Sequence, residues 1–537
     1  MTAQDQTSPG TPGPALLVAT AAARAIVPDA STTARRFDHS RFDHSPALTG
    51  IGRPPMRDFA LFLLVALVLR APWLGDPLFH ADEQFYLLVG ERLWHGVIPY
   101  VDLWDRKPLG LFLIYGAASA FPGNAVITYQ LMAIAAAAAT AVIIARCARL
   151  LAGPRGATFA GLAYLIYLMA FNCGMGQAPV FYDLPMMLAG WLVIGTLART
   201  AAVPPCDTGL LRRGCLAMAL VGLALQIKTS VVIEGCGFGL MLLWAAWREG
   251  WRWPRLAAAA ALWIALALLP TLIVFAAYAA QGQAQTFLVA NVVSIVGRGQ
   301  DLGEASFRLA KVLVALVPFY VALWIGWRRA ALCPEGLMAR RGVLLWLGMA
   351  VIGFLAPGTW YDHYVAPALM PLAILAAPAL DGRCRVTGWL RRGLFLVGLG
   401  AGLGATTVQA HKFGTTYDLD EAAAAIRPHI DATHCLYVYE GDSALYRATQ
   451  SCLPTRFAFP AHLSTRYEEH ALGIDPTTEV ARIMASRPGA VVIGESAHPY
   501  APNLRTRAVL LQALASHYRR IGTLTLGTRS FGLFASR

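Results

Sequence analysis

The sequence predicts an all-α polytopic membrane protein with about eleven transmembrane helices, followed by a small α/β domain. Hydrophobic residues make up 57% of the 537 residues and charged residues only 14%, whereas soluble domains carry roughly 25% charged residues. The mean hydropathy is +0.52, and the apolar residues recur in long stretches from about residue 57 to 410. This composition excludes a soluble enzyme.

The first 55 residues are rich in Thr, Pro, Ala and Ser and predict a disordered cytoplasmic tail. A tandem duplication lies within them, because the run from Arg36 to Ser40 is repeated from Arg41 to Ser45. Each copy carries one His, but two spaced His on a flexible segment bind a metal weakly. We interpret the repeat as low-complexity sequence.

The region from 56 to 410 contains eleven apolar stretches that approach the roughly twenty residues a helix needs to cross a bilayer. These stretches lie near residues 57–74, 125–147, 157–172, 184–199, 215–228, 230–247, 256–280, 307–327, 343–357, 363–380 and 393–410. A further apolar segment, Leu109 to Phe121, is only about thirteen residues long. It is better suited to a re-entrant or interfacial helix than to a full span.

Basic residues support this count through their positions. Lys and Arg collect in short cytoplasmic loops of membrane proteins, and here every alternate loop is basic, as with Arg146, Arg149 and Arg155. With a cytoplasmic N-terminus, eleven spans place the C-terminus outside the inner (plasma) membrane. The net charge of +13 therefore reflects topology, and no nucleic-acid partner is expected.

After about residue 411 the composition becomes that of a soluble domain. Strand-like runs at 435–439, 490–493, 523–526 and 531–534 alternate with helical patterns at 476–486 and 505–518, which predicts an extracytoplasmic α/β domain over 411–537. Cys435 and Cys452 both fall in it. An oxidising compartment would permit a disulfide between them, but the sequence leaves open whether it forms.

The first outer loop, residues 76–124, concentrates charged groups. Its helical pattern places Asp82 and Glu83 at the start of an interfacial helix, where the positive end of the helix dipole favours ionised carboxylates. An ionised Asp82 could accept a hydroxyl proton as a general base. Alternatively, Asp82 merely caps the helix.

Further polar residues are predicted on the same side of the membrane, where charges are functional candidates because they are costly near lipid. Asp183 could orient an acceptor or cap the next helix, and Lys228 needs a carboxylate or phosphate partner unless it extends to the interface. The polar segment from 281 to 307 predicts an outer loop that gates the site or contacts substrate. A cluster of aromatic, acidic and imidazole side chains lies near the end of the apolar region and consists of Tyr361, Asp362 and His363. This cluster predicts a binding role.

Several other activities lack their sequence motifs. The chain has no phosphate-cradling Gly-rich motif with its Lys, no GxSxG elbow and no zinc-type His pair. These absences argue against an ATP-driven pump and a serine hydrolase. The oxygen and imidazole groups on the outer side leave a divalent metal as an open alternative, although no close ligand spacing supports one, and no cofactor is assigned.

At Asp82-Glu83, followed by Gly96, Pro99 and Lys107-Pro108, the sequence resembles the membrane glycosyltransferases of the GT-C fold. Within these it is similar to the branch of the protein O-mannosyltransferases and lipid A aminoarabinose transferases. Two further runs carry the same resemblance, which covers roughly residues 57 to 410: Gly222 to Lys228, and Tyr361 to Tyr364 with Pro367 and Pro371.

The resemblance implies transfer of a sugar from a polyprenyl-phosphate carrier to an envelope acceptor (a glycan, lipid or protein) at the outer membrane face, with inversion. It places the catalytic carboxylate on Asp82, with Glu83 beside it, and a cation for the donor phosphate on Lys107. Asp183 occupies a region where family members often have a Glu. The other residues assigned to the site bind the donor phosphate (Arg106, Lys228) and the acceptor or substrate (Asp183, Arg298, Tyr361, Asp362, His363).

Two other classes of function are alternatives to the transferase. A transporter of a polar or lipid-linked solute would also carry intramembrane charges, but the charges gather on one face and no internal repeat is visible. In a noncatalytic receptor with a ligand-binding outer domain, Asp82 and Lys107 would be replaceable. Neither class explains the composition of the first loop.

Overall fold

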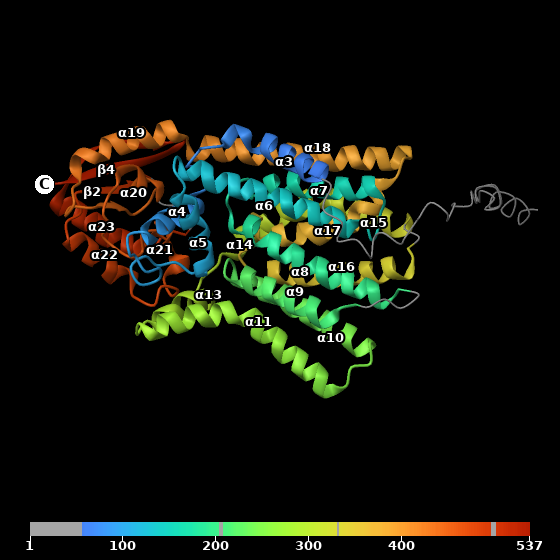
Figure 1. Cartoon of the computed structure of the whole chain (residues 1–537). Helices are drawn as coiled ribbons and strands as arrows, with labels where there is room; N and C mark the ends of the chain where they lie inside the picture. Colours follow the sequence, from blue (N-terminus) through green and yellow to red (C-terminus); the bar gives the residue numbers. More distant parts are fainter. Residues whose placement is uncertain (1–55, 203–207, 330–331, 496–500) are drawn as a thin grey trace, which may run out of the picture. The chain divides into compact units, whose positions relative to one another are not determined.

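The computed structural model describes residues 56–202, 208–329, 332–495 and 501–537. The predicted tail and its duplicated segment lie outside these residues. Figure 1 shows the described helices and, in orange and red, the C-terminal α/β domain.

Every apolar stretch of the sequence contains a helix. Among the described helices, seven are long and apolar enough to cross a membrane, or eight if α14 and α15, which meet at a 46° bend, form one span. Three more, α3, α7 and α9, have 15 to 17 residues. The helices are α3 (Met56–Arg70), α6 (Ala125–Ala148), α7 (Pro154–Ala170), α8 (Ala178–Thr200), α9 (Leu210–Leu225), α10 (Val232–Arg248), α11 (Trp253–Ala280), α14 (Leu302–Ala315), α15 (Val317–Arg329), α16 (Pro334–Leu355), α17 (Ala366–Asp381) and α18 (Arg385–Phe413).

Helix α17 lies at the centre of this group and packs against α7, α15 and α16. Its sequence is rich in Ala and Pro, and all but two of its residues are buried. Close approach requires small residues on the facing helix. Gly156 of α7 meets this requirement, because a Cβ there would lie 2.4 Å from the carbonyl oxygen of Ala377.

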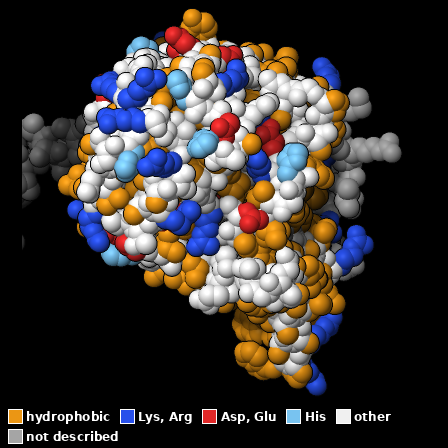
Figure 2. Space-filling model, turned by 90° about the vertical axis from the view of Figure 1, so that its left-hand side faces the viewer, with side chains coloured by type: hydrophobic (Ala, Val, Ile, Leu, Met, Phe, Trp, Pro, Cys, Tyr) orange, Lys and Arg blue, Asp and Glu red, His pale blue; other side chains and the backbone are white. Residues whose placement is uncertain are grey.

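Helix α11 packs mainly against α9 and exposes much of its apolar surface, including Leu272 and Ile273. In Figure 2 the part of the molecule that projects at the bottom, at the height of α11 in Figure 1, is largely hydrophobic. Exposed apolar side chains over such a length are typical of a helix that faces lipid.

One end of the long helices carries α4 (Ala81–Leu93), α5 (Leu109–Ala120) and the C-terminal domain; we call it the site end (Figure 1). The apolar α5 has 12 residues, as expected for a helix too short to span. The segment predicted as a polar loop at 281–307 is largely helical. It contains α12 (Ala284–Leu288), the π-helical η4 (Val289–Val293) and α13 (Ser294–Val296).

The C-terminal domain contains all four predicted strands, β1 (Leu436–Val438), β2 (Ala490–Gly494), β3 (Tyr518–Leu526) and β4 (Arg529–Ser536). They form one sheet in the order β1-β2-β4-β3, in which β1 and β2 are parallel and the other pairs antiparallel. Both predicted helices, α22 (Pro476–Ala485) and α23 (Leu504–His517), are present. The sequence patterns did not reveal α19 (Thr416–Ile426), α20 (Ala444–Thr449), α21 (Ala461–Ser464) or the 3₁₀ turn η7 (Arg466–Glu468).

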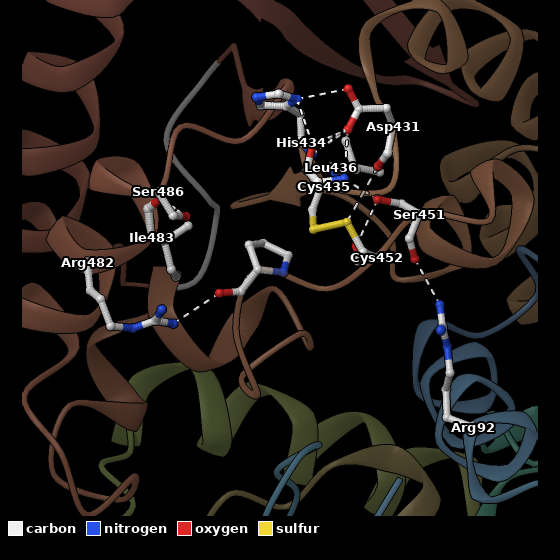
Figure 3. The surroundings of a disulfide bond; sticks show 12 residues. Arg92, Asp431, His434, Cys435, Leu436, Ser451, Cys452, Arg482, Ile483 and Ser486 are labelled. Atoms are coloured by element: carbon white, nitrogen blue, oxygen red, sulfur yellow. Dashed lines mark hydrogen bonds and ion pairs between the residues drawn. A yellow bond between two sulfur atoms is a disulfide. The ribbon is translucent and has the colours of Figure 1, made fainter. Parts of the chain in front are cut away.

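Cys435 and Cys452 form a disulfide (Figure 3). It joins the residue before β1 to the segment that follows α20. Beside it, the Ser451 hydroxyl accepts the backbone N–H of Leu436 at 2.7 Å. The bridge and this bond fix the segment after α20 to the edge of the sheet.

Candidate active site

The site is organised by the N-terminus of α4. His80 is the N-cap, and its ring nitrogen accepts the backbone N–H of Asp82 at 3.3 Å. Asp82 therefore lies in the first turn and is not the cap, so the capping alternative is wrong. A carboxylate in the first turn is stabilised by the positive end of the helix dipole.

Asp82 is partly exposed and lies among hydrogen-bond donors and cations. The Gln177 side-chain amide donates to its carboxylate at 3.2 Å and also contacts the His80 ring. Burial alone would raise the pKa of Asp82, but the neighbouring His80, Lys107 and His363, together with the hydrogen bond from Gln177, outweigh burial and lower the pKa below its usual range. Asp82 is therefore ionised at neutral pH.

Glu83, the next residue, has different surroundings. Its side chain is fully buried, and neither carboxyl oxygen has a hydrogen-bond partner. Burial raises its pKa to about 8, against the smaller lowering influence of the nearby Gly176 N–H and Tyr129 hydroxyl. Glu83 is therefore mostly protonated at pH 7. Two adjacent carboxyl groups thus hold opposite protonation states, because one faces the polar site and the other faces the helix packing.

The structure brings two lysines to Asp82. Lys107 lies 5.3 Å from the Tyr86 ring centroid and Lys228 lies 4.2 Å from that of Tyr364. Burial lowers the pKa of Lys228 to about 8, and the charges of Lys107 and Asp82 act on it as well. Asp82, Lys107 and Lys228 therefore belong to one electrostatic group.

His363 completes this group. Its ring centroid is 6.1 Å from that of His80, edge to face, and it contributes to the lowered pKa of Asp82. It comes from the turn that precedes α17, so the site joins the first loop to the centre of the helix group.

Arg106 and Arg298 share a partner that the sequence analysis missed. Both guanidinium groups pair with Glu468 of η7, Arg106 through two hydrogen bonds and Arg298 at 3.1 Å. The Glu468 side chain is only 4% exposed. Burial alone would raise its pKa, but the two arginines lower it to about 2. No motif marks Glu468, because the pairing depends on contacts between residues far apart in sequence.

Tyr361 and Asp362 lie beside this arrangement. The Arg298 and Arg308 guanidinium carbons lie 5.6 and 4.2 Å from the Tyr361 ring centroid. The Asp362 carboxylate faces Lys311 and Asn172, each at 3.3 Å, and not the Asp82 group.

Asp183 lies apart from Asp82. It is in α8, whose N-cap is Gln177, so it is not the cap that the sequence analysis weighed. The carboxylate is fully buried between helices and accepts the Tyr164 hydroxyl at 2.9 Å.

Metal-ligating side chains do not cluster here. Within the part of the chain that the structure describes, no three His, Cys, Asp or Glu residues are placed to hold a metal ion together. The groups gathered at the site end are instead the ionised carboxylate of Asp82, the paired carboxylate of Glu468 and several cations. This set suits a reaction in which a hydroxyl is aligned and a negative charge develops opposite it.

The fold is that of known membrane glycosyltransferases. The crystal structure of ArnT from Cupriavidus metallidurans bound to undecaprenyl phosphate matches with a TM-score of 0.59 and 15% identity, covering 88% of this chain and 97% of that one. The apo state of the same protein matches with a TM-score of 0.58 and equal identity and coverage.

A crystal structure of the Archaeoglobus fulgidus oligosaccharyltransferase matches with a TM-score of 0.48 and 10% identity. The match covers 93% of this chain and 75% of that one. Neither the protein-family models nor the curated proteins contain a match to this sequence. The predicted GT-C fold is thus confirmed.

Proposed function

We propose that this chain is a membrane glycosyltransferase that moves a sugar from a polyprenyl-phosphate carrier to an envelope acceptor, with inversion at the anomeric carbon. The observation that carries the proposal is the grouping of a partly exposed, ionised Asp82 with Lys107 and Lys228 at the site end. The shared fold supports it, because ArnT was crystallised with undecaprenyl phosphate.

In the proposed step, the acceptor hydroxyl oxygen forms a bond to the anomeric carbon while the bond from that carbon to the phosphate oxygen breaks. The leaving electron pair stays on the phosphate. Asp82 accepts the hydroxyl proton, and its lowered pKa favours alignment of the hydroxyl first and proton transfer late in the step. A single displacement of this kind inverts the anomeric configuration.

The cations neutralise the charge that builds up on the leaving phosphate. Lys107 lowers the pKa of Asp82, and the charges of Lys107 and Asp82 both act on Lys228. We assign the two lysines to the phosphate. Arg298 extends the same positive surface through Tyr361, while Arg106 is held by Glu468 beside it.

The remaining candidates receive supporting roles. Glu83 is mostly protonated at pH 7, so it fixes the start of α4 and is not the base. We propose that His363 and Tyr361 contact the acceptor or the transferred sugar, and that Asp362 orients this turn through Lys311. The position of Asp183 between helices supports a role in packing.

The orientation in the membrane is also a proposal. The basic residues Arg149, Arg155, Arg248 and Arg252 lie at the ends of helices opposite the site end, and such residues favour the cytoplasmic side. The site and the domain over 411–537 would then lie outside the inner membrane. The disulfide Cys435–Cys452 supports this, because disulfides persist in oxidising compartments.

The test is sugar transfer by the purified full chain in lipid nanodiscs, with a panel of polyprenyl-phosphate sugars and native envelope acceptors. We expect transfer by the parent and by Asp420→Asn, an exposed control, and a loss of about 10³-fold in a folded Asp82→Asn protein. The proposal fails if no donor is consumed, and solute uptake by proteoliposomes would then favour a transporter. Equal rates for Asp82→Asn and the parent would remove Asp82 from the mechanism.

A further inference from the structure

A cavity that is distinct from the Asp82 group lies where the C-terminal ends of α4 and α5 meet α20 of the C-terminal domain. Its volume is about 630 Å³. The three elements lie next to one another in Figure 1. Its polar and aromatic lining includes Glu91, Arg92, Trp94, His95, Arg447 and Gln450.

After its ion pair is counted, the lining of this cavity keeps a positive charge. Arg447 binds Glu91 through two hydrogen bonds of 2.6 and 2.7 Å, so these two charges neutralise each other. Arg92 instead donates to a neutral group, the Ser451 carbonyl, at 2.8 Å (Figure 3). The lining therefore keeps the charge of Arg92, which favours an anionic ligand.

Trp94 offers a flat apolar surface in the same cavity. Its side chain is 64% exposed, although its indole N–H donates to the Gly116 carbonyl at 2.9 Å. This bond fixes the orientation of the ring while its face remains open. A preoriented aromatic face beside charged hydrogen-bonding groups is suited to a ligand with both C–H surfaces and polar substituents, such as a sugar ring.

The part of the lining that comes from the C-terminal domain is also held in place. Gln450 ends α20 in the left-handed conformation, with φ 55°, which a residue with a side chain rarely adopts. The next residues, Ser451 and Cys452, are tied to the sheet edge by a hydrogen bond and the disulfide. The cavity is thus built from fixed elements on both sides.

The distance between this cavity and Asp82 indicates which part of a substrate could bind in the cavity. Asp82 and Glu91 lie nine positions apart on α4, or about 14 Å along the helix axis. We propose that the cavity binds an anionic sugar unit of the acceptor that is distal to the reacting hydroxyl. This inference rests on the proposed function and adds to it the chemical class of the acceptor.

The experiment measures binding to the full chain in nanodiscs, without donor, by isothermal titration calorimetry. The probes are trigalacturonate and glucose 6-phosphate, with maltotriose and inorganic phosphate as the neutral and sugar-free comparisons. We expect one or both anionic sugars to bind, at least about tenfold more weakly to Trp94→Ala and to Arg92→Gln. Trp253→Ala, at an exposed tryptophan of α11, should bind like the parent, and Trp94→Phe should retain most of the affinity.

Three outcomes overturn the inference: no binding of either anionic sugar, equal binding of maltotriose, or equal binding of inorganic phosphate. The assay needs no transfer, so the two proposals can fail separately. An inactive protein that binds anionic sugars through Trp94 would refute the transferase and keep the cavity assignment. An active protein that binds none of them would do the reverse.

Discussion

Asp82 at the site end and the carboxyl groups between the membrane helices have opposite kinds of partners. Asp82 is partly exposed and lies among Lys107, Lys228 and histidines. Asp183 and Glu234 are buried between helices and accept hydrogen bonds from neutral groups, the Tyr164 hydroxyl at 2.9 Å and the Trp346 indole at 2.7 Å. An acid with cations and an opening is arranged for a charged ligand, whereas an acid sealed with a neutral donor serves the packing.

The distinction between the two kinds of acid fails if replacing either acid by its amide has the same effect on kcat and on the melting temperature. Asp82→Asn should lower kcat for sugar transfer by about 10³-fold with little change in melting temperature. Asp183→Asn should instead leave kcat per folded molecule within about threefold and lower the melting temperature, because its hydrogen bond with Tyr164 is altered. Paired transfer assays and thermal scans in nanodiscs measure both. A kcat loss in Asp183→Asn equal to that in Asp82→Asn would contradict the distinction.

The lysines near Asp82 allow a second test of the proposed site. Lys228→Gln should lower kcat by about 10²-fold, because the leaving phosphate loses one of its charge partners. Lys412→Gln, at the end of α18, is the matched control and should transfer at the parental rate. Steady-state kinetics with varied donor tests this, and an unchanged kcat in Lys228→Gln would remove this lysine from the phosphate site.

Glu468 tests whether the C-terminal domain contributes to the site. In Glu468→Gln, Arg106 and Arg298 lose their shared counter-charge, so we expect roughly a tenfold rise in the donor KM with a smaller change in kcat. The neighbouring Glu469→Gln, which breaks only a surface pair with Arg505, should leave both constants unchanged. If the two variants behave alike, Glu468 does not position the arginines.

The smallest expected effect is a pH dependence of stability from Glu83. Its folded pKa of about 8 exceeds the ordinary value of 4.5, so the folded state keeps a proton that the unfolded chain has lost. This contribution is fully present below pH 4.5 and is lost as the pH rises towards 8. Glu83→Gln stays neutral and should melt roughly 3 °C higher than the parent at pH 8.5, with no gain at pH 4.5. A gain that is equal at both pH values would refute the raised pKa.

Local patterns were enough to predict the long apolar helices and the four strands. The run of apolar residues over 256–280, for example, identifies α11 by itself, and the strand-like run at 490–493 corresponds to β2. The segment at 281–307 was misread because it contains polar residues. Asn291 and Ser294 are nonetheless buried in helix, since each donates to a backbone carbonyl one turn earlier, Phe287 and Ala290.

The site was predictable only in part. Asp82 and Lys107 both lie in the predicted first outer loop, residues 76–124. A sequence motif could therefore place them together. The hydrogen bond from Gln177 to Asp82 joins residues 95 positions apart, and Arg106 lies 362 positions from Glu468. A single sequence carries no signal for such pairs, because they are set by the packing of whole elements and not by local periodicity.

The length of α11 links the site to the lipid around the protein. Its 28 residues extend about 42 Å, which exceeds the roughly 30 Å hydrocarbon core of a typical bilayer. A helix of this excess length adapts to bilayer thickness by tilting, and few of its residues are buried against neighbouring helices. Because α11 leads directly into α12, η4 and α13, which precede Arg298, we expect the tilt of α11, and with it the acyl chain length of the surrounding membrane, to act on the segment that carries this guanidinium group.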